Sequence, residues 1–122
     1  MAKLSRIAPE LPAADLSAAI AFYERLGFEV ASRMPAHDYA IVERDGIAIH
    51  LFEEKMRCDA QNGVHIFTHD LAGLFEEFAA RGVLFAQTIE RKPWGNREFR
   101  IRDDFGNELK FTEPAAEPGA GS

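Results

Sequence analysis

The segment at residues 15–28, DLSAAIAFYERLGF, is the strongest indication of the fold, because it predicts a complete helix and marks both of its ends. Asp15 is a good N-cap residue, the apolar residues after it recur at helical spacing, and Gly27 suits the position just past a helix C-terminus. A second segment of this kind begins at Asp70 and ends at Gly82, each 55 positions after its counterpart. The spacing predicts that one supersecondary unit occurs twice.

Short apolar or alternating runs surround both helices and predict strands. In the first half we expect strands over residues 28–33, 39–43 and 47–52, a turn around Pro35 and a hairpin turn at Asp45-Gly46. In the second half we expect strands over residues 63–68, 83–88, 97–103 and 108–112. The predicted order is strand, helix and three strands, twice.

The chain has 122 residues and a mass of 13.6 kDa, which is the size of one domain. Its 47% hydrophobic and 28% charged residues are typical of a globular protein. We therefore expect a single domain over residues 1–113, with modules at about residues 4–55 and 62–113. Residues 114–122 carry no periodic apolar residues and are expected to form a flexible tail.

Charge and composition exclude several classes of partner. A net charge of −6 would repel nucleic acid and anionic membranes but attract a cationic small molecule. No apolar stretch is long enough for a membrane span, and the N-terminus lacks the apolar region of a signal peptide. The single cysteine, Cys58, lies in a polar stretch and cannot form an intrachain disulfide. These features favour a cytoplasmic protein.

Three motifs carry a resemblance to a known family. The run AFYERLGF at residues 21–28 resembles the FYxxLGF signature of the vicinal oxygen chelate superfamily, which includes glyoxalases, bleomycin resistance proteins and dioxygenases. The turn DFGN at residues 104–107 resembles the DPxGN turn in the second half of that family. The segment PWGNREF at residues 93–99 is similar to one found in bleomycin resistance proteins. The resemblance spans roughly residues 5–113.

The resemblance implies an α+β fold in which two βαβββ modules form a half-open barrel that is completed by a symmetric dimer. Enzymes of the superfamily hold a divalent metal with His and Glu side chains on the concave face of the strands. The positions that resemble those ligands are Ala8 on the first strand, His50, Gly63 and Lys110. Because only His50 can donate to a metal, we expect no metal site and no cofactor.

The bleomycin resistance group binds a cationic glycopeptide in clefts at a dimer interface and stacks its flat tail between aromatic rings. The matching aromatic residues here are Trp94 and Tyr39. An indole between Pro93 and Gly95 in a polar loop is suited to stacking on a planar heterocycle. The alternative is that Trp94 only caps one end of the barrel.

Strand parity and charge supply the other candidate ligand-binding residues. If the family register holds, one strand face carries Glu10, Ala48, His50, Phe52, His65 and Phe67. Acidic groups that could hold a cationic ligand are Glu10, Asp38 and Glu98. The two phenylalanines could equally belong to the core, and the two histidines could have structural roles.

The charges of the last strands leave two questions open. Arg97-Glu98-Phe99 could belong to an edge or interface strand with ion-paired charges, in which Glu98 and Arg100 share one face. Lys110 could pair with a neighbouring carboxylate or indicate an anionic ligand.

The sequence therefore favours a homodimer that sequesters a planar, cationic, bleomycin-like antibiotic and confers resistance without catalysis. The alternative is a metal-dependent lyase or dioxygenase of the same fold that acts on a small metabolite through His50. A third possibility is a binding protein for an unrelated small molecule.

Overall fold

The computed structural model describes residues 2–55 and 61–115, and the chain divides into two compact units at residues 60 and 61. Cys58 and residues 116–122 of the expected tail lie outside the described residues. Within the described part, no helix is both long enough and apolar enough to span a membrane.

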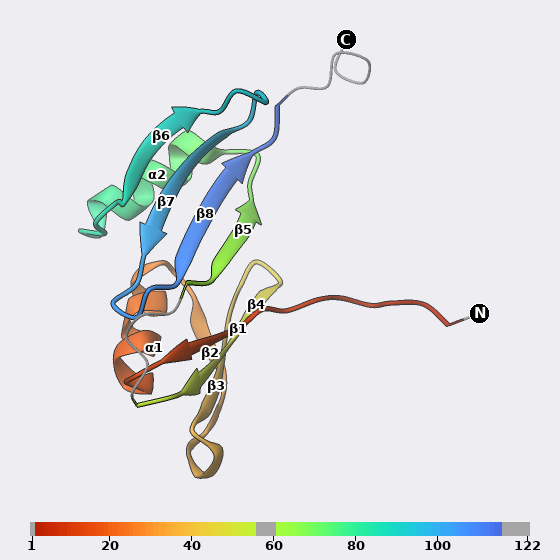
Figure 1. Cartoon of the computed structure of the whole chain (residues 1–122), viewed down its shortest axis with the longest axis vertical. Helices are drawn as coiled ribbons and strands as arrows, with labels where there is room; N and C mark the ends of the chain where they lie inside the picture. Colours follow the sequence, from red (N-terminus) through yellow and green to blue (C-terminus); the bar gives the residue numbers. More distant parts are fainter. Residues whose placement is uncertain (1, 56–60, 116–122) are drawn as a thin grey trace. The chain divides into compact units, whose positions relative to one another are not determined.

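The first unit has the element order β, α, β, β, β with a short 3₁₀ turn (Figure 1). Its elements are β1 (Glu10–Ala13), α1 (Leu16–Arg25), β2 (Glu29–Met34), η1 (Pro35–His37), β3 (Tyr39–Arg44) and β4 (Ile47–Glu53). The sheet order is β1-β4-β3-β2, and only the β1 and β4 pair is parallel.

The second unit repeats this topology (Figure 1). Its elements are β5 (Gly63–Phe67), α2 (Leu71–Ala80), β6 (Gln87–Arg91), β7 (Arg97–Arg102) and β8 (Glu108–Glu113). The sheet order is β5-β8-β7-β6, again with only the first and last strands parallel. The predicted α+β class and the two βαβββ modules are confirmed.

The helix ends form as their sequences predict. The Asp15 carboxylate accepts a hydrogen bond from the N–H of Ala18, and the Asp70 carboxylate accepts one from the N–H of Gly73. Gly27 and Gly82 follow the two helices with φ values of 86° and 76°, a backbone conformation that glycine adopts without strain. The capped helices are therefore the repeated feature that the spacing indicated.

Each helix packs on one face of its own sheet and leaves the other face open. Under α1 the sheet buries alternate aliphatic residues, which are Leu11, Ala40, Val42, Ile49 and Leu51. Under α2 the buried residues of the sheet are more aromatic and include Phe99, Ile101, Leu109 and Phe111, and Phe78 of the helix packs against two of these rings. The rings of Phe99 and Phe111 stack with centroids 5.1 Å apart. The open faces are where side chains are available to a ligand.

One predicted strand lies in the wrong place. Residues 83–86 were expected to be β-strand, but β6 begins at Gln87 and extends through Arg91. Two of the apolar residues before it pack in the second unit instead, since Val83 is buried and the ring of Phe85 stacks on that of Phe75 in α2 at 4.3 Å. Because β6 is an edge strand, most of its residues are polar, and its sequence shows little of the alternation between apolar and polar residues that predicts a strand.

Two smaller corrections concern the first unit. Ala8, which the resemblance places on the first strand, precedes β1, because that strand begins at Glu10. The turn around Pro35 is a 3₁₀ turn that ends at Asp38 in the left-handed conformation, with φ of 51°. The hairpin at Asp45-Gly46 forms as predicted, with both φ values positive as a tight two-residue turn requires.

Candidate functional site

The open face of the first sheet carries four of the predicted site residues. Glu10 on β1 pairs in register with His50 on β4, and Tyr39 on β3 lies opposite Phe52 on β4. Residues in register point to the same side of a sheet, and the alternate residues of β4, Ile49 and Leu51, are buried toward α1. We call Glu10, Tyr39, His50 and Phe52 the first open face.

The side chains of Glu10, Tyr39 and His50 are linked by two polar contacts. The hydroxyl of Tyr39 lies 2.7 Å from Oε2 of Glu10 and 2.7 Å from Nδ1 of His50. The rings of Tyr39 and His50 meet edge to face, with centroids 5.6 Å apart. The carboxylate, the phenol and the imidazole therefore hold one another in place on three neighbouring strands.

The environment of Tyr39 stabilises its neutral form. Burial, the hydrogen bond to Glu10 and the negative charge of Glu10 together raise the pKa of Tyr39 to about 12 from its ordinary value of 10.0. The phenol therefore keeps its proton well above neutral pH.

We expect this raised pKa to appear in the absorbance titration of tyrosinate, taken as the difference between the wild type and Tyr39→Phe. Substituting Glu10→Gln removes the negative charge and replaces the charged hydrogen-bond acceptor with a weaker, neutral one, so the pKa of Tyr39 should fall from about 12 toward 10.0. The native state holds the proton of Tyr39 more tightly than the unfolded chain does. The contribution of Tyr39 to the free energy of unfolding is therefore fully present below pH 10 and is lost as the pH rises to about 12. An unchanged titration in the Gln variant would contradict the assignment.

Asp38 and Phe52 complete the predicted residues of the first unit. Phe52 is half-buried opposite Tyr39 and adds an aromatic surface to the first open face. Asp38 is exposed at the end of the 3₁₀ turn, next to Tyr39 in sequence, and its backbone carbonyl accepts a hydrogen bond from Glu53. The structure shows no contact of its carboxylate with Glu10 or His50, so Asp38 lies beside the hydrogen-bonded residues and is not bonded to them.

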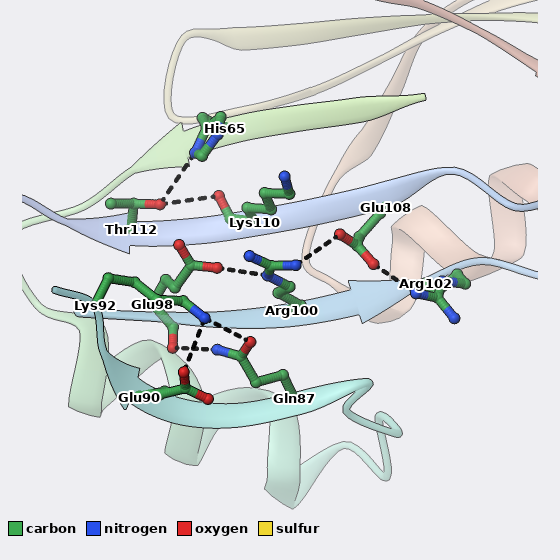
Figure 2. A network of polar contacts seen from close by, with 10 residues as sticks. All are labelled: His65, Gln87, Glu90, Lys92, Glu98, Arg100, Arg102, Glu108, Lys110 and Thr112. Carbon is green, nitrogen blue, oxygen red and sulfur yellow. Dashed lines mark hydrogen bonds and ion pairs between the residues drawn. The ribbon is translucent and has the colours of Figure 1, made fainter. Parts of the chain in front are cut away.

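The open face of the second sheet combines an aromatic pair with charges. His65 and Phe67 lie on β5 with their rings stacked at 6.1 Å, and Phe67 is 59% exposed. Nδ1 of His65 lies 3.4 Å from the hydroxyl of Thr112 on β8 (Figure 2). Since the side chain of Phe67 is exposed in the single chain, Phe67 is not a core residue of the second unit.

Glu98 is engaged by a neighbouring cation. Its carboxylate is only 2% exposed and lies 2.5 Å from Nε of Arg100, as Figure 2 shows. Arg100 also contacts Glu108 at 3.3 Å, and Arg102 binds the same Glu108 at 2.6 Å. Although burial opposes it, the Arg102 hydrogen bond and the charges of Arg100 and Arg102 hold the pKa of Glu108 below its ordinary value.

The ion pair between Glu98 and Arg100 bears on the alternative that residues 97–99 form an edge or interface strand with ion-paired charges. Glu98 and Arg100 do share a face and form an ion pair, but β7 is an inner strand, so an edge strand is wrong. A cationic ligand could reach Glu98 only by competing with Arg100. Lys110 pairs in register with both His65 and Arg100, and its backbone carbonyl accepts a hydrogen bond from the hydroxyl of Thr112. Its ammonium group makes no hydrogen bond or ion pair with the residues that the structure describes, although its charge helps to lower the pKa of Glu108.

Trp94 lies in the tight turn between β6 and β7. Hydrogen bonds from Lys92 to Asn96 and from Gly95 to Lys92 close this turn, and Gly95 has φ of 102°. The indole is 67% exposed, so it is not part of the hydrophobic core. A large aromatic surface held in a short turn is available for stacking.

The structure thus brings together Glu10, Tyr39 and His50, and separately His65 and Phe67. Sequence reasoning missed Thr112, the partner of His65, although the alternation of Glu108, Lys110 and Thr112 along β8 places it on that face. It also missed the hydrogen bonds of Lys92 to Gln87 and Glu90, because they depend on the displaced strand β6 (Figure 2).

The donor set does not fit the metal site of the superfamily. Gly63 has no side chain, and Lys110 offers an ammonium group where a carboxylate would be needed. Within residues 2–55 and 61–115, no three His, Cys, Asp or Glu side chains form a group that could hold a metal ion. The expectation of no metal stays a prediction.

Comparisons with known proteins agree with the fold. The sequence profile of the Glyoxalase/Bleomycin resistance protein/Dioxygenase superfamily matches residues 3–111. Comparison with curated proteins found no match. Among solved structures, the chain is similar to a bleomycin-binding protein complexed with bleomycin, with a TM-score of 0.81 and 22% identity over 91% of this chain and 99% of that one.

Two further solved structures are similar to this chain. A bleomycin-binding protein from bleomycin-producing Streptomyces verticillus, complexed with copper(II)-bleomycin, has a TM-score of 0.80 and 31% identity over 93% of this chain and 99% of that one. A lactoylglutathione lyase from Agrobacterium tumefaciens has a TM-score of 0.72 and 23% identity over 90% and 94%. This chain therefore belongs to the glyoxalase/bleomycin resistance protein/dioxygenase superfamily.

Proposed function

We propose that this protein binds and sequesters a planar, cationic, bleomycin-like glycopeptide antibiotic and so confers resistance without making or breaking a bond. The observation that carries the proposal is the exposed indole of Trp94, held in the turn between β6 and β7. Phe67 and Phe52 offer further aromatic surface on the two open faces. The similarity to the Streptomyces bleomycin-binding protein supports the same ligand class.

Charge supports a cationic ligand. The net charge of −6 attracts cations over distances near the Debye length, and the carboxylates of Glu10 and Asp38 lie on or beside the first open face. The proposed mechanism is retention alone, which is supported by Gly63 and Lys110 at two positions where the resemblance implies metal ligands. Titration calorimetry with bleomycin tests it: we expect saturable binding, and the absence of binding heat at several temperatures would contradict it.

Trp94 gives the most direct variant. We expect Trp94→Ala to weaken bleomycin binding roughly tenfold, because the stacking surface is lost, and Trp94→Phe to weaken it less than roughly threefold. Since Trp94 is exposed, neither substitution should alter the thermal unfolding midpoint appreciably. Equal affinities of the alanine variant and the wild type, measured by calorimetry, would remove Trp94 from the binding site.

The proposal includes a homodimer in the cytoplasm that provides two binding clefts. Two apolar residues that precede β1, Leu4 and Ile7, are almost completely exposed in the single chain. A second copy that covers them would remove this apolar surface from water.

We expect the double substitution Leu4→Ser and Ile7→Ser to convert the dimer to monomers. Light scattering coupled to gel filtration measures this directly, because the mass should fall from twice the chain mass to 13.6 kDa. A substitution at exposed Leu84, on the connection before β6, is the matched control. A wild type that is monomeric at all concentrations would contradict the dimer.

The alternative function is a metal-dependent lyase or dioxygenase, and the similarity to a lactoylglutathione lyase favours it. It requires a stoichiometric divalent metal, which elemental analysis of the purified protein would detect. Sequestration requires none.

A further inference from the structure

The hydroxyl of Tyr39 has one proton and two polar neighbours, each at 2.7 Å. Glu10 is exposed, and its carboxylate can only accept hydrogen bonds when ionised. If Tyr39 donated its proton to His50, the two oxygens of Tyr39 and Glu10 would face each other at 2.7 Å with no hydrogen between them. Tyr39 therefore donates to Glu10.

This direction determines the proton on His50. With its hydrogen given to Glu10, the oxygen of Tyr39 can only accept, so the short contact to Nδ1 of His50 requires an N–H at that nitrogen. In a neutral imidazole the other nitrogen, Nε2, then carries a lone pair. Among the residues that the structure describes, Nε2 has no hydrogen-bond partner.

We propose that Glu10 and Tyr39 are positioning residues that fix His50 in the Nδ1–H form, so that Nε2 accepts a hydrogen bond from an N–H group of the ligand. The inference rests on the proposed function and specifies its chemistry. A ligand that presents amide, amidinium or ammonium N–H groups satisfies Nε2, whereas a carboxylate or a quaternary ammonium group does not. Tyr39 then contributes its hydroxyl to orientation as well as its ring to the surface.

The first test uses the free protein, so it does not depend on whether bleomycin binds. Long-range ¹H–¹⁵N NMR of histidine-labelled protein at pH 8 distinguishes a protonated ring nitrogen from one with a lone pair. We expect the wild type to have the proton of His50 on Nδ1. In Tyr39→Phe we expect the proton to move mainly to Nε2, the form that free histidine favours.

His65 is the internal control, because it lies on the other sheet and its signals should not change in Tyr39→Phe. A wild-type His50 with its proton on Nε2 would overturn the proposal. An unchanged Nδ1–H form in the phenylalanine variant would overturn the role of Tyr39. Thermal unfolding of the variant confirms that the protein remains folded.

The second test asks which ligand chemistry His50 selects. Benzamidinium and phenyltrimethylammonium are both aromatic cations, but only the first has N–H groups. We expect benzamidinium to shift the Nε2 signal and to bind roughly three- to tenfold more tightly than phenyltrimethylammonium. In Tyr39→Phe this preference should disappear. Equal shifts and affinities in the wild type would mean that charge and stacking alone attract the ligand, and the proposal would fail.

Discussion

Substitution of Arg100 by methionine is expected to destabilise the protein by about 3 kcal/mol, because it leaves the carboxylate of Glu98 buried without its cation. Glu98 is 2% exposed on the inner strand β7, and Arg100 is the partner of its carboxylate in Figure 2. Methionine keeps much of the volume of the arginine stem, so lost packing contributes little. Chemical denaturation followed by circular dichroism measures the loss.

Arg102 provides the matched control on the same strand. It pairs with Glu108 but is largely exposed, so Arg102→Met should cost less than about 1 kcal/mol. The double variant Glu98→Leu with Arg100→Met removes both charges and should recover most of the stability that Arg100→Met loses. If the two single arginine variants are equally stable, Glu98 does not depend on Arg100.

The second large effect is expected at Asp103, in the turn between β7 and β8. Its buried carboxylate accepts hydrogen bonds from the N–H groups of Phe105 and Asn107 and from the side-chain amide of Asn107, at 2.7 to 2.9 Å. Burial raises the pKa of Asp103, against the effect of these hydrogen bonds. We expect Asp103→Ala to cost about 2–4 kcal/mol, because the turn loses all three bonds.

Asp104 is the control within the same turn, since its side chain is exposed. Asp104→Ala should change the free energy of unfolding by less than about 0.5 kcal/mol. The difference between the two alanine variants, measured by denaturation, reports what the hydrogen bonds of Asp103 contribute. A loss below about 1 kcal/mol for Asp103→Ala would contradict the structural role given to this carboxylate.

Local signals in the sequence predicted most of the fold. The caps at Asp15 and Asp70 and the glycines at positions 27 and 82 act on their own neighbours, so single-sequence reasoning identified both helices. The displaced strand β6 shows the limit. Val83 is buried and Phe85 packs on Phe75 of α2, and apolar residues that pack on a helix leave the same pattern in the sequence as a strand.

For the candidate site, the sequence predicted which residues share a face but not the contacts between their side chains. Alternation within one strand placed His50 and Phe52 on one face, and the register implied by the family resemblance added Glu10 to it. Strand parity did not predict that Tyr39 bridges Glu10 and His50, since that contact depends on how β1, β4 and β3 pair. Parity also did not predict that Glu98 is buried beside Arg100, because that burial depends on β7 being an inner strand.

We propose that the protein retains the antibiotic unchanged, and a plasmid-nicking assay with iron-activated bleomycin measures this retention through the protection of DNA. We expect DNA cleavage to stop once the protein supplies one binding site per antibiotic molecule, and unmodified bleomycin to be recovered when the complex is denatured. Undiminished cleavage at an excess of protein, or recovery of a chemically altered antibiotic, would contradict the claim.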